Sequence, residues 1–153
     1  MSKGIHGFSL LDVLIAMAVL AIVSSIAAPI YSQFADDAND TAAASEIMQI
    51  QLAIDRFNSQ TFTYPDSLDE LPEVPAQDPW GNAYVYLRID GNGTPGLRGR
   101  QRKDKNLNPL NTDFDLYSTG KDGATRLPLT APPSHDDIIR AGNGSFVGRG
   151  EDH

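Results

Sequence analysis

Apolar residues follow two different patterns in the first sixty positions of the chain. From Val13 to Ile30 nearly every residue is apolar and none is charged, which is long enough to span a membrane. Polar residues then return, and apolar ones recur every three or four positions, the period of one helical face: Ile47, Ile50, Ile54 and Phe57. These patterns predict one long helix from Phe8 to about Asn58, apolar all round at first and amphipathic afterwards.

A carboxylate and a proline interrupt the apolar run. Asp12 lies just before Val13, where burying a carboxylate in a membrane costs on the order of 2.5–3.5 kcal/mol. Pro29 lacks an amide donor and clashes with the preceding turn, so we expect a kink or a local break there. Lys3 precedes the run, which predicts a cytoplasmic N-terminus and an exported remainder.

After the helix, the apolar positions alternate with a period of two. Residues 83–89 and 113–118 show this alternation and are predicted to be two antiparallel strands that pack on the helical stripe. A short helix with Ser134 as its cap is expected within residues 131–139, followed by a loosely held, glycine-rich tail. The predicted fold class is α+β. Trp80, Tyr84 and Tyr86 are read as core and hairpin packing rather than as a binding platform.

The loop at residues 94–110 is rich in glycine, proline and basic residues. We expect a solvated surface loop, and the alternative is a basic patch that meets acidic patches on neighbouring subunits. The basic residues are Arg98, Arg100, Arg102, Lys103 and Lys105.

Composition excludes several classes of function. The chain has 153 residues and a formal net charge of -8, which argues against nucleic-acid binding. It has no cysteine, so a metal is one alternative to disulfides for stapling a small exported domain. The glycine-rich runs spell neither a P-loop nor a dinucleotide fingerprint, and no nucleophile-elbow pattern is present. We therefore do not expect an enzyme.

Acidic residues gather in the C-terminal part of the chain. Calcium prefers carboxylate and carbonyl oxygens from flexible loops, but the spacing is not that of an EF-hand. The residues alone leave two alternatives open, a calcium site or solvated acids and helix caps. The acids concerned are Asp113, Asp115, Asp122, Asp136 and Asp137.

Three segments together resemble a known family. Gly7-Phe8 precedes an apolar helix with an acid at the fifth residue counted from Phe8, and this resembles the type IV filament family of type IV pilins and type II secretion pseudopilins. Residues 78–86 and 117–123 resemble two segments of the major pseudopilins. The resemblance implies a pilin-like fold, with a long N-terminal helix packed on a small antiparallel sheet that has long C-terminal loops.

The resemblance also implies roles for residues near the N-terminus. A prepilin peptidase would cut between Gly7 and Phe8 and methylate the new amine of Phe8. The acid, here Asp12, would face the N-terminal amine of a neighbouring subunit. The family usually has Glu at that place, so the reach is one methylene shorter. Pro29 falls where the family often has a helix-disrupting proline.

The organisation and function implied are those of a filament subunit. Residues 1–7 would be a cytoplasmic leader peptide, 8–31 the transmembrane and filament-core helix, and 32–153 a periplasmic globular head. The chain would polymerise with itself in a pseudopilus that helps drive protein export. Its partners would be minor pseudopilins, the prepilin peptidase, the inner-membrane secretion platform and the membrane. Alternatives are a type IV pilin of a surface pilus and a membrane-anchored calcium-binding domain that does not polymerise.

The resemblance further implies a calcium ion in the C-terminal loops. Matched to the family's segments, the candidate ligands are the side chain of Asp122, that of Asp136 or Asp137, and the backbone oxygen of Thr119. The intervening loop, residues 124–135, is longer than in typical members.

Overall fold

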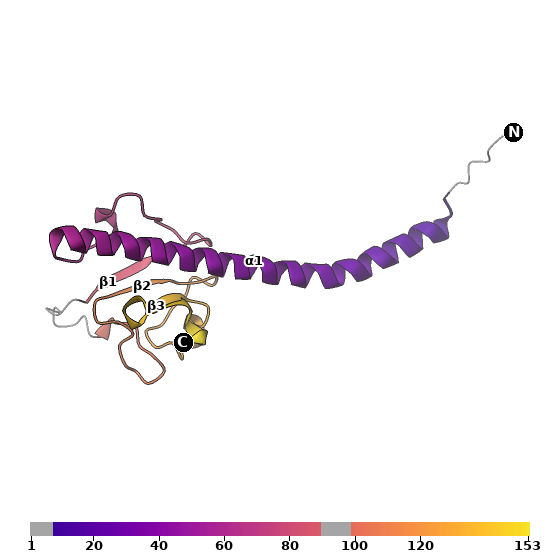
Figure 1. The fold of residues 1–153 in the computed structure, drawn as a ribbon. Helices are drawn as coiled ribbons and strands as arrows, with labels where there is room; N and C mark the ends of the chain where they lie inside the picture. Colours follow the sequence, from indigo (N-terminus) through magenta and orange to yellow (C-terminus); the bar gives the residue numbers. More distant parts are fainter. Residues whose placement is uncertain (1–7, 90–98) are drawn as a thin grey trace. The chain divides into compact units, whose positions relative to one another are not determined.

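The computed structural model describes residues 8–89 and 99–153. The chain forms two compact units, one ending at Asp37 and the other running from Ala38 to His153. Helix α1, Leu10–Thr61, contributes to both units (Figure 1). It begins two residues after the predicted start and ends three residues after the predicted end.

Helix α1 continues through Pro29 without interruption. Of the two predicted outcomes, a kink or a local break, the break is therefore wrong, and the kink stays a prediction. A proline removes a single backbone donor and crowds one carbonyl, and the helix, which has the strong helix formers Ala27 and Ala28 immediately before Pro29, continues past it.

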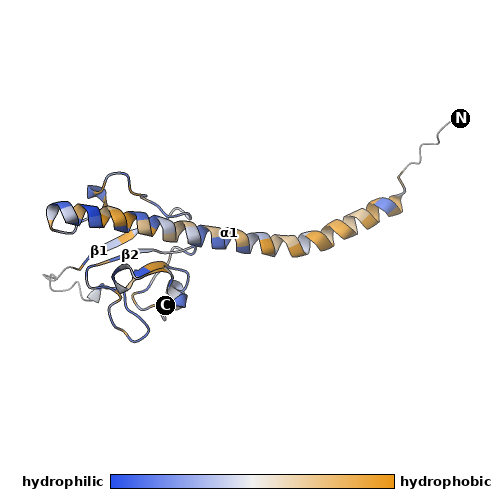
Figure 2. Ribbon diagram, in the orientation of Figure 1, coloured by the Kyte–Doolittle hydropathy of each residue, from blue (hydrophilic) through white to orange (hydrophobic). Residues whose placement is uncertain are grey.

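In the first unit, none of the residues that the structure describes is buried. Every residue from Phe8 to Ala35 is exposed, and apolar colouring predominates in this part of the helix in Figure 2, apart from a hydrophilic turn near its N-terminal end. The helix is long and apolar enough to cross a membrane. Among the described residues, α1 alone meets these criteria.

The second unit contains a four-stranded antiparallel sheet in the order β1-β2-β3-β4. The strands are β1 (Val85–Arg88), β2 (Phe114–Ser118), β3 (Ile138–Ala141) and β4 (Phe146–Arg149). In the first pair Val85 lies opposite Tyr117 and Arg88 opposite Phe114, so the two predicted strands and their antiparallel pairing are confirmed. Short 3-10 turns complete the unit: η1 (Leu68–Glu70), η3 (Pro132–Ser134), η4 (Gly142–Gly144) and η5 (Gly150–Asp152).

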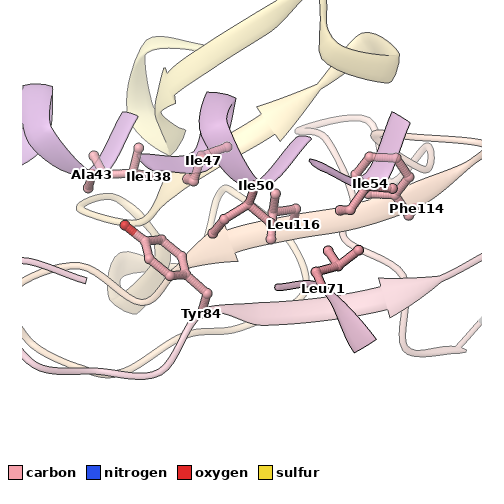
Figure 3. Close-up of a cluster of buried hydrophobic side chains, with 9 residues drawn as sticks. All are labelled: Ala43, Ile47, Ile50, Ile54, Leu71, Tyr84, Phe114, Leu116 and Ile138. Carbon is pink, nitrogen blue, oxygen red and sulfur yellow. The ribbon is translucent and has the colours of Figure 1, made fainter. Parts of the chain in front are cut away.

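One face of the sheet packs on the second half of α1. Ile47, Ile50 and Ile54 are fully buried and form one cluster with Phe114 and Leu116 of β2 (Figure 3). Phe57 packs against this cluster. This confirms the predicted helical stripe. Tyr84 belongs to the same cluster, and Trp80 and Tyr86 pack against it, which confirms that these aromatics serve packing.

The other face of the sheet is covered by the long loops. Successive side chains of a strand point to opposite faces, so Asp115 and Tyr117 lie away from α1. Tyr117 packs with Leu110, Leu129 and Ile139 in a second cluster. All of β2 is consequently buried.

The C-terminal residues correct two predictions. In place of a short helix capped by Ser134, η3 ends at Ser134, whose hydroxyl bonds the backbone of Arg126. In place of a loose tail, residues 146–149 form the edge strand β4. The turn between β3 and β4 contains Asn143 at a positive φ of 54°, where its side chain accepts a hydrogen bond from Thr112 N at 2.9 Å.

Candidate functional site

Asp12 belongs to the first turn of α1 and caps it. Its Oδ2 accepts a hydrogen bond from the backbone N–H of Ser9 at 3.0 Å, and the Ser9 hydroxyl accepts one from Leu11 N at 3.2 Å. This reciprocal arrangement is a variant of the capping box in which the serine accepts from the second helical amide instead of the third, and it satisfies amide groups that no earlier helical turn can bond. The carboxylate is thereby held at the positive end of the helix dipole, beside the N-terminus of the chain that cleavage after Gly7 would leave.

The role of Ser9 was missed by the sequence analysis. Its signal was present, because Ser9 and Asp12 have the Ser-x-x-acid spacing of a capping box, with Asp instead of the usual Glu or Gln. Phe8 lies just before the helix and is 92% exposed. Gly7 lies outside the described residues, so the predicted cleavage and methylation stay predictions.

The buried carboxylate of Asp78 connects the 78–82 turn with the end of β2. Its Oδ1 accepts hydrogen bonds from Trp80 N at 3.1 Å and Asn82 N at 2.8 Å. Its Oδ2 accepts one from the hydroxyl of Ser118, at the end of β2. One carboxylate therefore closes the 78–82 turn and joins it to the sheet.

Asn82 and Gly120 make the second link between the same segments. The amide of Asn82 donates to the Gly120 carbonyl oxygen at 2.8 Å. Gly120 has a φ of 66°, and a side chain there would collide with the backbone and carboxylate of Asp136. The two segments that carry the family resemblance, residues 78–86 and 117–123, are thus hydrogen-bonded to each other and stabilise the second unit.

The predicted calcium ligands divide into two groups. The carboxylate of Asp136 accepts a hydrogen bond from Asp122 N at 3.1 Å, and the carboxylate of Asp122 accepts one from Ala124 N at 2.7 Å. These two residues meet in the turn that follows β2. Thr119, which precedes that turn, is buried.

The carboxylate of Asp137 does not take part in that turn. It forms an ion pair with Arg102 instead. It is fully buried, and its Oδ2 accepts hydrogen bonds from Arg102 Nη2 at 2.7 Å and from the Thr125 hydroxyl at 2.6 Å. Burial raises the pKa of the Asp137 carboxyl above its ordinary value, while Arg102 and Thr125 oppose the rise. Arg102 itself is only 2% exposed. The prediction that its loop is solvated is therefore wrong at this residue, because the guanidinium finds buried oxygens to pair with.

These contacts do not fit a calcium ion that has Asp137 as a ligand, which is one of the two predicted alternatives; the alternative with Asp136 beside Asp122 and Thr119 is not tested by them. Calcium takes six to eight oxygens, yet the Asp137 oxygen that faces the loop already receives a guanidinium and a hydroxyl. Among the described residues no group of three or more acids or histidines is placed to hold a metal. The calcium site stays a prediction from the resemblance.

Comparisons with known proteins agree with the N-terminal and C-terminal patterns. Residues 2–28 match the family described as Prokaryotic N-terminal methylation motif. The chain is 28% identical over 138 residues to the type II secretion system core protein G of Pseudomonas aeruginosa, an alignment that covers 76% of this chain and 84% of the relative.

Relatives of the same name in other bacteria give the same result. The protein from Vibrio cholerae is 27% identical, with 76% of this chain and 81% of the relative covered. The protein from Escherichia coli is 25% identical, and the alignment covers 77% of this chain and 83% of the relative. No solved structure matches the chain significantly. The chain thus carries a pilin-type methylation motif and is similar to major pseudopilins over most of its length.

Proposed function

We propose that this chain is the main structural subunit of a type II secretion pseudopilus. It polymerises through the first half of α1, and the growing filament helps to move folded proteins across the outer membrane. The observation that carries the proposal is the helical segment from Leu10 to Ala35, which is apolar, entirely exposed and charged only at Asp12. The similarity to proteins named core protein G supports the same function.

The exposed apolar half of α1 lies first in the membrane and then in the filament. Before assembly it lies in the inner membrane, as its length and hydropathy allow. In the filament it packs against the same helix of neighbouring subunits, which removes the apolar side chains from water. The head, residues 32–153, remains in the periplasm in both states.

Asp12 sets the register between neighbouring helices. After a prepilin peptidase has cut between Gly7 and Phe8 and methylated the new amine, that amine is the cation which Asp12 of the next subunit meets. An ion pair formed in low dielectric offsets part of the desolvation of both groups. The capping box supports this role, because Ser9 holds one oxygen of Asp12 at the end of the helix where the amine arrives.

The shorter side chain of Asp, compared with Glu, is compatible with this geometry. Asp12 already reaches Ser9 N at 3.0 Å within its own chain. The carboxylate is therefore fixed close to its own helix, and the neighbouring amine must approach to that position. Minor pseudopilins and the inner-membrane platform complete the assembly. The chain itself performs no covalent chemistry.

Replacement of Asp12 tests the proposal in a strain that lacks the native chain. Asp12→Ala is expected to abolish filaments and secretion, whereas Asp12→Glu retains both because the charge is kept. The matched control is Asp55→Ala, which removes an exposed acid from the second half of α1 and is expected to leave assembly intact. The mass of the purified protein is expected to correspond to a chain that begins at Phe8 and carries one added methyl group.

The outcomes separate the alternatives. A membrane-anchored domain that does not polymerise predicts that Asp12→Ala has no effect. A surface pilus predicts extracellular filaments with normal secretion when the chain is absent. Unchanged unfolding of the Asp12→Ala head, followed by the fluorescence of the single tryptophan, Trp80, excludes misfolding as the cause of lost assembly.

A further inference from the structure

We propose that the guanidinium of Arg102 is the cation that fastens the long C-terminal loop to the sheet, so that the head holds this loop without calcium. The loop in question is residues 124–137, between β2 and β3. The proposal goes beyond the function in secretion and does not depend on filament assembly.

Arg102 is fixed on the face of the sheet opposite α1. Its backbone N–H donates to Asp115 Oδ2 at 2.7 Å, and its guanidinium carbon lies 4.4 Å from the centroid of the Tyr117 ring. Both partners belong to β2 and point away from the helix. A cation over an aromatic ring in a buried site is stabilised by the ring quadrupole.

From this position the guanidinium gathers three oxygens of the loop. Nη1 donates to the Thr125 hydroxyl and to the Arg126 carbonyl, the latter at 2.8 Å. Nη2 forms an ion pair with Asp137 at 2.7 Å, and the two side chains are 2% and 0% exposed. A hydroxyl, a carbonyl and a carboxylate are the oxygen types that calcium collects from loops, and here a planar fork with fixed donors collects them.

The neighbouring backbone continues the same attachment. Lys103 N donates to Leu127 O at 2.9 Å, and Leu129 N donates to Lys103 O at 3.0 Å. Removing the cation would leave Asp137 buried without its partner, which is among the costliest single changes in a small domain. Arg102 is therefore the side chain whose loss is expected to weaken the attachment of this loop most, although backbone hydrogen bonds also hold the loop.

A calcium ion at Asp137 would compete with this arrangement. It would bring two positive charges next to a buried guanidinium, and like charges in a site of low dielectric repel strongly. The only feature that favours a metal there is Asp137 Oδ1, which has no hydrogen-bond partner within the part of the chain that the structure describes. A metal bound at this oxygen would raise the melting midpoint of the native chain in calcium.

The test is thermal unfolding of the full chain in detergent micelles, followed by Trp80 fluorescence. The native chain is expected to have the same melting midpoint in millimolar calcium and in excess chelator. Arg102→Met is expected to lower that midpoint by about 10 °C or more. The matched control is Arg100→Met, two residues away and exposed, and it is expected to leave the midpoint unchanged.

A further variant keeps the proposal testable if Arg102→Met does not fold. Arg102→Lys retains the charge but loses the planar fork, so its midpoint is expected to lie below that of the native chain. A rise of several degrees in the native midpoint on adding calcium would overturn the proposal. It would also be overturned if the Arg102 variants melted together with Arg100→Met.

Discussion

Asp78→Ala is expected to destabilise the head severely, because one buried carboxylate serves two elements. The change removes the acceptor for Trp80 N, Asn82 N and the Ser118 hydroxyl. A donor left without a partner costs about 1–3 kcal/mol when it is fully buried, as the Ser118 hydroxyl is, and less at the half-buried Trp80 and Asn82 amides. The losses overlap within one network, so we expect about 3–5 kcal/mol in total. In a domain of this size, that lowers the melting midpoint by about 10 °C or more.

The chain contains a natural control for this experiment. Asp104 caps its own turn in the same way, accepting hydrogen bonds from Asn106 N at 2.8 Å and Asn108 N at 2.7 Å. Asp104 itself is half-buried, but its hydrogen bonds lie at an exposed site, and in the described residues none of its side-chain bonds reaches beyond its own loop. Asp104→Ala is therefore expected to have a much smaller effect.

Urea unfolding followed by Trp80 fluorescence measures both variants. Asp78→Asn adds a second comparison, because its amide oxygen can still accept the two backbone hydrogen bonds while the link to Ser118 is changed. Its stability is expected to fall between those of the native chain and Asp78→Ala. The reasoning is refuted if Asp78→Ala and Asp104→Ala are destabilised equally, since the link between the segments would then contribute nothing.

Two further predictions concern the interface between α1 and the sheet. Burial, with help from the hydrogen bond to Glu46 at 2.6 Å, raises the pKa of the Tyr84 hydroxyl above its ordinary value of 10.0. Above pH 10 the unfolded chain ionises first, so urea unfolding is expected to show a fall in stability there that is reduced in Tyr84→Phe; an identical fall in both proteins would contradict this. Ile50→Ala, at a fully buried position, is expected to cost about 2–5 kcal/mol. Leu52→Ala, 61% exposed on the same helix, is expected to cost little in the same assay, and equal losses would argue against the packing described.

The elements with regular periodicity could be predicted because local pattern and tertiary packing agree. Ile47, Ile50 and Ile54 recur with the helical period, and all three have no exposed surface. The alternation in 83–89 and 113–118 identified the central strand pair, although β1 itself covers only Val85–Arg88. These segments bury apolar side chains on one face, which is the property that periodicity measures.

The second half of the sheet could not be predicted in the same way. Residues 138–141 are buried throughout, so they show no alternation, and β4 contains Gly148, which weakens the strand signal. A turn signal was nevertheless present in Gly142-Asn143-Gly144. β3 joins the sheet by pairing with β2 across a long loop, and a local sequence pattern does not show such a non-local pairing. β4 pairs with β3, so its place in the sheet depends on that of β3.

The candidate functional residues of the two units differ in the same respect. The position of Asp12 at the start of the helix follows from local sequence, and so does its capping partner Ser9. The pairing of Arg102 with Asp137 joins residues 35 positions apart, and nothing near Arg102 distinguishes it from the other basic residues of its loop. A buried ion pair of this kind becomes visible only when the fold brings the two segments together.

The central claim is that subunits assemble through the N-terminal helix with Asp12 as the register charge. The most direct measurement is the structure of the assembled filament by electron cryo-microscopy. We expect the apolar halves of α1 at the centre and the Phe8 amine within ion-pair distance of Asp12 of a neighbouring subunit. The claim is contradicted by a filament whose subunits touch only through their heads, or one in which Asp12 meets no amine of another subunit.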